Sequence, residues 1–257
     1  MPFQNPADNR WIAARIEPVR IAALTDIHAV SSTLEQALSA ARREGFDVLL
    51  LMGDLLTYGV APLETIALVQ DAVARDGAIL ITGNHDQMYQ QASDVGRRYL
   101  TRLPDWIQET VAWTNEQLPA GVMDAFDWQQ HWSAGPLFVA HANPYAFGDW
   151  RYINSAEEAG AAAVALAERG FRYGLFGHTH RARRFDSAAG TIFTLGSLGQ
   201  PRDGREGHMQ WAMIEIQGDE VMVSPRLLPF DRHAHCQAIR ATSLSVSAQD
   251  RLCGFFT

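Results

Sequence analysis

The chain has few positive charges and very few cysteines. Its 257 residues include 21 lysines and arginines against 29 aspartates and glutamates, a formal net charge of −8. Because unspecific binding to nucleic acid or anionic lipid depends on a basic surface, this charge argues against both partners. Only Cys236 and Cys253 are present, without CxxC spacing. Reduced thiols are the favoured interpretation, and a C-terminal disulfide is the alternative.

Other absences bear on localisation and domain organisation. The N-terminus has no basic region followed by an apolar segment, and no apolar run approaches membrane-spanning length. We therefore expect a cytoplasmic protein with no membrane partner. No internal repeat, low-complexity tract or linker interrupts the chain. With 47% hydrophobic and 19% charged residues, residues 1–257 are expected to form a single domain around a large core.

Strand-like apolar runs alternate with amphipathic helical patterns over the first two thirds of the chain, which predicts an α/β fold. The expected strands are 20–24, 48–52, 78–81, 137–140 and 173–176, and the expected helices are 32–44, one beginning near Pro62, and 155–169. Ser32, with Glu35 three residues later, predicts a capping box at the first helix.

The pattern changes in the middle and at the end of the chain. From about 94 to 132 the segments are helical and carry Trp106, Trp113, Trp128 and Trp132, which predicts an inserted helical cap. The runs 191–195, 210–216 and 220–227 predict an antiparallel second sheet, with a turn at Gly218-Asp219 joining the last two. Residues 231–257 have weak periodicity and predict no element.

Five short polar motifs directly follow apolar runs, at the carboxyl ends of expected strands. They are Asp26-Ile27-His28, Gly53-Asp54, Gly83-Asn84-His85-Asp86, His141 and Gly177-His178-Thr179-His180. Because open α/β sheets build their sites at these strand ends, we expect the side chains to converge. Within the first and last motifs, the i, i+2 spacing places both ligands on one side of an extended segment. Imidazole and carboxylate groups together suit divalent transition metals.

Each motif has a simpler explanation when it is taken alone. A Gly-Asp pair after a strand is usually a turn, and an isolated His141 is more often a hydrogen-bonded core residue. The joint occurrence in order favours a metal site. No role is predicted for four histidines without motif context, His131, His208, His233 and His235. The tryptophans are expected to pack in the core, and Glu157-Glu158 is expected to start a solvated helix.

The motif order DxH, GD, GNHD, H and GHxH resembles that of the calcineurin-like metallophosphoesterases. The stretch 196–204, GSLGQPRDG, resembles a bacterial and archaeal branch of small predicted phosphodiesterases. The resemblance implies a four-layer α/β/β/α sandwich of two facing mixed sheets, here with a small helical cap. It also implies two divalent metal ions (manganese, iron, zinc or nickel). One would be held by Asp26, His28, Asp54 and His180, and the other by Asp54, Asn84, His141 and His178, with Asp54 bridging.

The same resemblance implies hydrolysis of a small phosphoester by a metal-bound hydroxide. His85 would be the general acid, and Asp86 would orient or charge its imidazole. Asn84 would ligate metal through its side-chain oxygen and also hold the substrate phosphate. Arg202 would either bind that phosphate or form a salt bridge within its own turn.

Two departures from the family pattern are informative. Ala29-Val30 follow His28 where the branch commonly has Gly-Asn, which alters the mouth of the site. Tyr58 and Gln87 occupy positions where phosphatase relatives carry arginines. Without those guanidinium groups, a diester monoanion is a better substrate than a monoester dianion or a polyphosphate.

The leading hypothesis is therefore a dinuclear metal-dependent phosphodiesterase. One alternative is a phosphomonoesterase or nucleotide pyrophosphohydrolase with the same metals. Another is a catalytically silent member of the family that binds protein, although the complete ligand set and His85 argue against it. No feature of the sequence indicates an oligomeric state.

Overall fold

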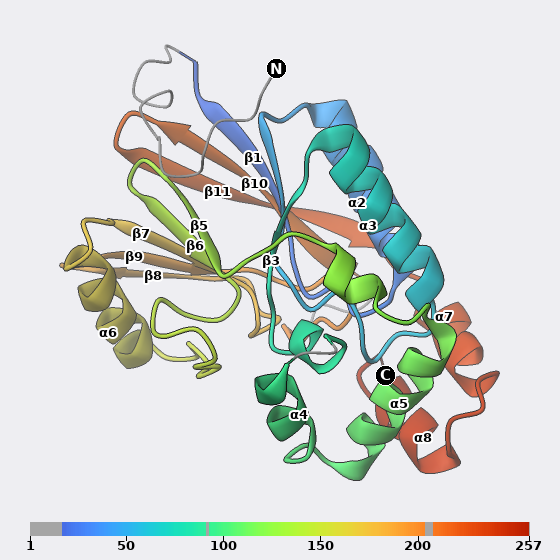
Figure 1. Cartoon of the computed structure of the whole chain (residues 1–257). Helices are drawn as coiled ribbons and strands as arrows, with labels where there is room; N and C mark the ends of the chain where they lie inside the picture. The colour runs from blue at the N-terminus through green and yellow to red at the C-terminus, as the bar shows by residue number, and fades with distance from the viewer. Residues whose placement is uncertain (1–16, 91–92, 204–207, 257) are drawn as a thin grey trace.

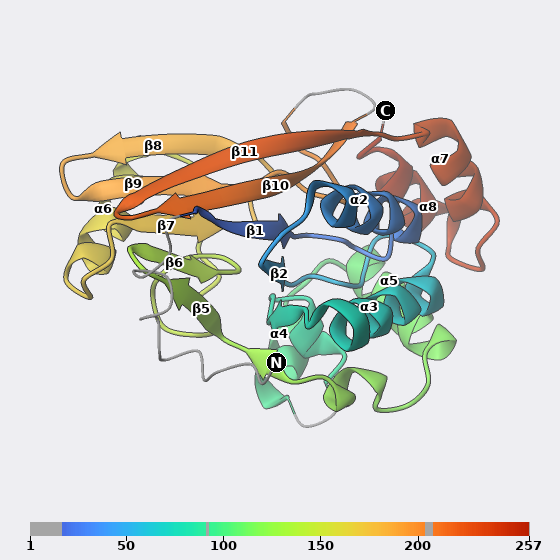
Figure 2. The ribbon, with the colours of Figure 1, turned by 90° about the horizontal axis from the view of Figure 1, so that it is seen from above.

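The computed structural model describes residues 17–90, 93–203 and 208–256, in which two β-sheets face each other between outer helices (Figures 1 and 2). The N-terminal residues 1–16 and Gly204 of the 196–204 stretch lie outside the described residues. No described helix is long and apolar enough to cross a membrane.

The first sheet has six strands in the order β11-β10-β1-β2-β3-β4. Their bounds are β1 Val19–Leu24, β2 Val48–Leu51, β3 Ile79–Ile81, β4 Trp128–Gln129, β10 His208–Gln217 and β11 Glu220–Pro229. Strands β1 to β4 are parallel, whereas β10 is antiparallel to both β1 and β11. Parallel neighbours need crossover connections, and α2 (Ser31–Glu44) and α3 (Pro62–Asp76) provide the first two.

The second sheet has five strands in the order β5-β6-β7-β9-β8. Their bounds are β5 His131–Ala134, β6 Leu137–Ala140, β7 Tyr173–Phe176, β8 Arg183–Ser187 and β9 Gly190–Thr194. Strands β6, β7 and β9 are parallel, and the two edge strands are antiparallel to their neighbours. Helix α6 (Ala156–Ala167) connects β6 to β7.

Side chains of each strand alternate between two apolar layers. In β1, Ile21 and Ala23 pack between the sheets, whereas Ala22 and Leu24 pack against α2 and α3. Helix α6 covers the outer face of the second sheet (Figure 1). Strands buried on both faces explain the continuous apolar runs in the sequence. The predicted α/β/β/α arrangement of two mixed sheets is confirmed.

The prediction that 191–195, 210–216 and 220–227 form one antiparallel sheet is wrong. Strand β9 lies in the second sheet beside β7, whereas the β10-β11 hairpin extends the first sheet. Strand β10 is apolar on both faces, because Trp211 and Met213 contact the helical layer while Ala212 and Ile214 face the other sheet. Such a strand is stable only inside a covered sheet, next to β1.

The expected cap region, about 94–132, contains helical elements up to Ala125 and strands after it. Between β3 and β4 lie η1 (Asp86–Met88), α4 (Asp94–Leu100), α5 (Asp105–Gln117) and η2 (Val122–Ala125). The helical assignment of Trp128 and Trp132 is wrong, because these residues belong to β4 and β5. Residues 231–257, where no element was predicted, contain α7 (Arg232–Arg240) and α8 (Val246–Cys253). Cys236 and Cys253 are free thiols.

Helix starts also differ from the sequence prediction. Helix α2 begins at Ser31, one residue before the expected cap, and its N-cap residue Val30 provides no side-chain bond. The Ser32 capping box is therefore wrong. A capping box is present at α6, where Ser155 and Glu158 satisfy each other's backbone N–H groups. Glu158 thus belongs to a solvated helix start, as predicted.

Candidate metal centre

The polar motifs converge at one end of both sheets. Asp26, Asp54 and Asn84 follow β1, β2 and β3, whereas His141 and His178 follow β6 and β7. All five side chains are buried, together with His28 and His180. The convergence expected from parallel strand ends is therefore present.

The ligand-type side chains form two clusters, and within each the ligand atoms lie within 4.8 Å of one another. One contains Asp26, His28 and His180, and the other contains Asp54, His141 and His178. In the first, His180 Nε2 lies 3.2 Å from Asp26 Oδ1. In the second, His141 Nε2 lies 3.4 Å from Asp54 Oδ2. Each cluster contains three of the four ligands that the family resemblance implied for one ion; the first lacks Asp54 and the second lacks Asn84.

Hydrogen bonds to backbone carbonyls fix the orientation of every clustered imidazole. The Nδ1 atoms of three histidines lie next to carbonyl oxygens: His28 at 3.1 Å from Leu56, His141 at 2.7 Å from Met52, and His180 at 2.6 Å from Gln200. His178 has the opposite orientation, with Nε2 at 2.9 Å from the carbonyl of Trp150. Because a carbonyl only accepts, each contacting nitrogen carries the proton. In the neutral ring, the other nitrogen presents its lone pair to the cluster.

An unpaired carboxylate oxygen also indicates a site for a cation. Asp26 Oδ2 accepts from Thr25 Oγ1 at 2.9 Å and from the backbone N–H of His178 at 3.0 Å. Asp26 Oδ1 is buried and accepts no hydrogen bond among the described residues. A buried carboxylate oxygen without a partner is costly, and a cation would satisfy it. The donor set of imidazole and carboxylate groups therefore fits divalent transition metals.

Electrostatics favour the protonation state of a ligand at His28, His178 and Asp54, but not at His141. Burial lowers the pKa of His178 to about 3 and also lowers the pKa of His28, so both rings are neutral. Burial would raise the pKa of Asp54, but His141 and His85 outweigh it and hold the carboxyl ionised. Burial also opposes a charge on His141, yet Asp54 and Asp26 raise its pKa to about 10. A metal must therefore displace a proton from His141.

The loops that carry the ligands adopt an unfavourable backbone conformation. Among the described residues, those other than glycine with positive φ are Asp26, His28, Ala29, Asp54, Thr57, Tyr58, His178 and His180. This region costs an L-residue roughly 1–2 kcal/mol, and such residues concentrate at functional sites. Ala29 has φ 52° at the position where the branch commonly carries glycine. The absence of glycine therefore matters, because Ala29 must adopt a left-handed backbone conformation that glycine adopts without strain.

His85 lies at the edge of the two clusters and belongs to neither. Its backbone N–H donates to Asp54 Oδ1 at 2.8 Å, and its Nε2 lies 3.3 Å from the hydroxyl of Tyr58. The Nδ1 atom is buried and has no partner within the described part of the chain. Burial lowers the pKa of His85 to about 4, so the ring is neutral at pH 7.

The expected contact between Asp86 and His85 is not formed, which corrects that prediction. The Asp86 carboxylate instead accepts three backbone N–H groups, from Asp54 and Gly83 at 2.8 Å and from Leu55 at 2.9 Å. Burial and the charge of Asp54 raise the pKa of Asp86 to about 7, while the N–H groups favour its ionised form. Asp86 therefore ties the loop after β2 to the loop after β3.

Comparison with known proteins identifies the family. Residues 19–182 match the sequence model of the calcineurin-like phosphoesterases. The chain belongs to this family. An uncharacterized protein of Methanocaldococcus jannaschii is 23% identical over 72% of this chain and 78% of its own length.

Solved structures of low identity have the same fold as this chain. A metallophosphoesterase from Sphaerobacter thermophilus is 24% identical, covers 92% of this chain and all of its own, and has a TM-score of 0.69. A hypothetical protein from Pyrococcus horikoshii is 18% identical, covers 91% of this chain and 97% of its own, and has a TM-score of 0.75.

The structure also describes the surroundings of the two residues expected to hold substrate. Asn84 Oδ1 lies 3.1 Å from His141 Nε2, and its amide nitrogen donates to the Tyr99 hydroxyl at 3.0 Å. The oxygen thus faces the second cluster. Arg202 Nε donates to Gln200 Oε1 at 3.0 Å, and the guanidinium lies 5.8 Å from the centre of the Phe255 ring. Within the described residues this arginine forms no salt bridge in its turn.

Several residues near the site were missed by sequence reasoning. The Tyr152 ring stacks on His178 at 4.2 Å, and the Trp150 carbonyl binds the same imidazole. Both residues belong to the segment 142–152 between β6 and α6, which has no motif. Its concentration of aromatic residues was the one available signal.

Proposed function

We propose that this phosphoesterase is a dinuclear metal-dependent phosphodiesterase that acts on a small phosphoester. The observation that supports this most is the position of Asp54. Its Oδ2 lies 3.4 Å from His141 Nε2 in one cluster and 4.0 Å from His28 Nε2 in the other. A single buried carboxylate that lies between histidine nitrogens of both clusters is suited to bridge two ions.

Two bound divalent ions, for which manganese, iron, zinc and nickel are candidates, would supply Lewis-acid activation of a water and neutralise phosphoryl oxygens. The protein supplies fixed ligands, because carbonyl hydrogen bonds hold each imidazole before substrate binds. Burial of the ligands limits access of bulk water. Asn84 is placed beside the second cluster, where its amide can also contact a phosphate oxygen.

His85 is the proposed acid for the leaving oxygen. Its pKa of about 4 means that the free site holds a neutral ring. To act as a general acid, the neutral ring must first take up a proton, which it then delivers to the leaving alkoxide. The Tyr58 hydroxyl, 3.3 Å from Nε2, holds the imidazole in place.

The preference for diesters is supported by the residues around the clusters. Tyr58 and Gln87 are both buried and offer no guanidinium group. Arg202 acts on the site electrostatically, since it contributes to the lowered pKa of His85, but Gln200 already binds its Nε. A diester carries one negative charge on its phosphoryl oxygens and therefore needs less compensation than a monoester dianion.

Four substrates assayed side by side at equal manganese concentration test this function. We expect bis-p-nitrophenyl phosphate to be hydrolysed faster than p-nitrophenyl phosphate, with negligible turnover of a phosphoserine peptide and of diadenosine tetraphosphate. Asp54→Asn, purified in parallel, is the control for contaminating hydrolases. Faster turnover of the monoester or the tetraphosphate would favour a phosphomonoesterase or a pyrophosphohydrolase, and no turnover of any ester would favour a binding protein.

A further inference from the structure

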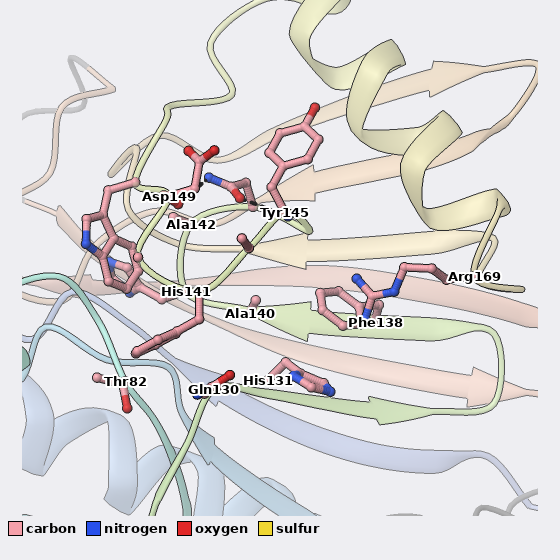
Figure 3. A pocket seen from close by; sticks show the side chains of 15 residues that line it. Thr82, Gln130, His131, Phe138, Ala140, His141, Ala142, Tyr145, Asp149 and Arg169 are labelled. Carbon is pink, nitrogen blue, oxygen red and sulfur yellow. Dashed lines mark hydrogen bonds between the residues drawn. The ribbon is translucent and has the colours of Figure 1, made fainter.

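A cavity of about 270 Å³ lies beside the metal centre, at the edge of the second sheet (Figure 3). Thr82 and His141 line one end of it, and His131, Phe138 and Arg169 line the other. Figure 3 shows Ala140 between the two ends, where its small side chain leaves space. His141 and Phe138 are three residues apart at the end of β6, which corresponds to about 10 Å.

The cavity combines flat apolar walls with unused polar groups. Tyr145, Phe147 and Trp150 contribute aromatic rings to its lining. The Arg169 guanidinium lies 4.4 Å from the centre of the Phe138 ring and donates one bond to the Pro144 carbonyl at 2.9 Å. Within the described residues Arg169 has no carboxylate partner, and the amide of Gln130 makes no hydrogen bond. Donors are therefore left for a ligand.

The charge that this cavity offers is positive. Asp149, its acidic lining residue, is bound by Arg151 through Nε at 2.9 Å, and this contact lowers the pKa of the Asp149 carboxyl. Burial and the nearby Arg169 lower the pKa of His131, which leaves its imidazole neutral. Arg169 is thus the uncompensated charge, so a ligand with acceptor atoms is favoured over one with donors only.

The loop that forms the cavity wall also holds a metal ligand. The Asn143 amide donates to the carbonyls of Asp149 at 2.8 Å and Arg151 at 3.0 Å, which fixes the loop conformation. From the same loop, the Trp150 carbonyl binds His178. A group in the cavity is therefore held at a defined position relative to the metal clusters, as required to orient a substrate.

We propose that this cavity binds the nucleobase of a phosphodiester substrate, with the rings as stacking surfaces and Arg169 and Gln130 as donors to the base. This inference rests on the proposed function, because the phosphate would lie at the metal clusters. A simple alkyl group would use neither polar side chain, and a small anion would leave the aromatic walls uncovered. A heteroaromatic ring about 10 Å from the metal ligands satisfies both.

Two diesters with the same leaving group separate recognition from chemistry. In thymidine 5′-p-nitrophenyl phosphate and methyl p-nitrophenyl phosphate the bond that breaks is the same, and the retained alcohol differs. We expect kcat/KM to favour the thymidine ester by about tenfold or more, the usual size of one stacked base. Arg169→Met and Phe147→Ala should each reduce this preference by roughly three- to tenfold. Phe147 is 42% exposed, so its truncation should not impair folding.

Arg43→Met is the matched control, because Arg43 is an exposed arginine on α2, bonded to Ser39, and distant from the cavity. It should keep the preference. Equal kcat/KM values for the two esters in the native protein, or an equal loss in the Arg43 and Arg169 variants, would overturn the proposal.

A binding measurement tests the cavity without turnover. Thymidine 5′-phosphate, 2-deoxyribose 5-phosphate and inorganic phosphate are titrated into the metal-loaded protein by calorimetry. The nucleotide should bind about tenfold more tightly than the sugar phosphate, and Arg169→Met should reduce this difference. Equal affinities would reject the base site even if both esters are hydrolysed. Failure to hydrolyse either ester, with the nucleotide preference intact, would reject the phosphodiesterase function alone.

Discussion

The Nε2 atoms of His28 and His180 face each other at 3.2 Å. Both rings are committed to donate from Nδ1, to the carbonyls of Leu56 and Gln200, so two lone pairs meet in a buried space. Lone pairs at this distance repel, whereas a cation placed near both turns the repulsion into two coordinate bonds. The proposed metal would therefore stabilise this region.

Removal of metal should therefore lower the melting temperature. A protein saturated at about 100 times the dissociation constant gains roughly 2.7 kcal/mol, and each kcal/mol shifts Tm by about 2–4 °C in a chain of this size. Differential scanning fluorimetry with manganese and with EDTA measures the shift. His28→Phe keeps a ring and removes the ligand, so its Tm should respond less to manganese. An identical response in both proteins would contradict the role of this pair.

In the proposed dinuclear centre, substitution of the bridging Asp54 should affect both ions. Asp54→Ala should leave less than one metal per chain, because each cluster loses a shared ligand, whereas His180→Ala should weaken chiefly the ion bound with Asp26 and His28. Elemental analysis after dialysis measures both. His131→Ala, outside the clusters, is the control and should keep two ions. Two ions retained by the Asp54 variant would refute the bridged arrangement.

The function of His85 can be separated from metal binding. His85→Asn should retain the metals and lose about 10²- to 10⁴-fold in rate, the usual contribution of general acid catalysis. Alkyl leaving groups should suffer more than p-nitrophenol, which departs without a proton. Rates for esters of several leaving groups, compared with metal content, measure this. Equal losses for all of them would mean that His85 positions phosphate.

Substitution of Asp86 should lower the stability of the protein and should not change catalysis by His85. Asp86→Asn replaces an acceptor oxygen by an amide that faces N–H donors, so the free energy of unfolding should fall by about 1–3 kcal/mol. Urea denaturation measures the loss. Asp94→Asn on α4 is the matched control, because Asp94 is exposed and should change stability little. If the Asp86 variant instead shows the leaving-group dependence of His85→Asn at unchanged stability, Asp86 does not act by tying the two loops together.

Acidification should destabilise the C-terminal helices through His235. Burial lowers the pKa of His235 to about 4, and its ring lies 5.2 Å from Phe230 and 4.7 Å from Phe256. The unfolded chain binds a proton near pH 6.5, so stability present above that pH is lost as the pH falls toward 4.

His235→Phe keeps the ring packing and removes the titration. It should reduce the loss of unfolding free energy between pH 7 and pH 4 by about 1–3 kcal/mol in metal-free protein. Urea titrations at both pH values compare it with His233→Phe, an exposed neighbour. An equal pH dependence in native protein and the His235 variant would show that another group dominates.

Local sequence patterns were enough to predict the metal clusters. They were not enough to predict which distant strands pair. The ligand motifs are short, and each follows its own strand, so strand direction alone brings them together. The sheet that accepts β10 depends on its pairing with β1, which lies almost 200 residues earlier in the chain. Strand β8 escaped prediction because its side chains are polar and largely exposed, which removes the apolar alternation of a half-buried strand.

Asp86 illustrates a second limit of sequence reasoning. Its position next to His85 favoured a contact between neighbours, but side chains of consecutive residues point in different directions. The carboxylate instead reaches the backbone of Asp54 and Leu55, more than thirty residues earlier. The aromatic segment 142–152 was missed for a related reason, because its function comes from backbone carbonyls that any residue could provide.

The left-handed residues of the ligand loops have a consequence for the whole molecule. Positions such as Ala29 and Thr57 keep an unfavourable backbone only while their surroundings hold them. Those surroundings are the packed sheets, so a loosened core would release the loops before it unfolds the strands. Metal affinity then becomes a sensitive reporter of distant packing. A destabilising substitution between the sheets should appear first as weaker metal binding and only later as loss of secondary structure.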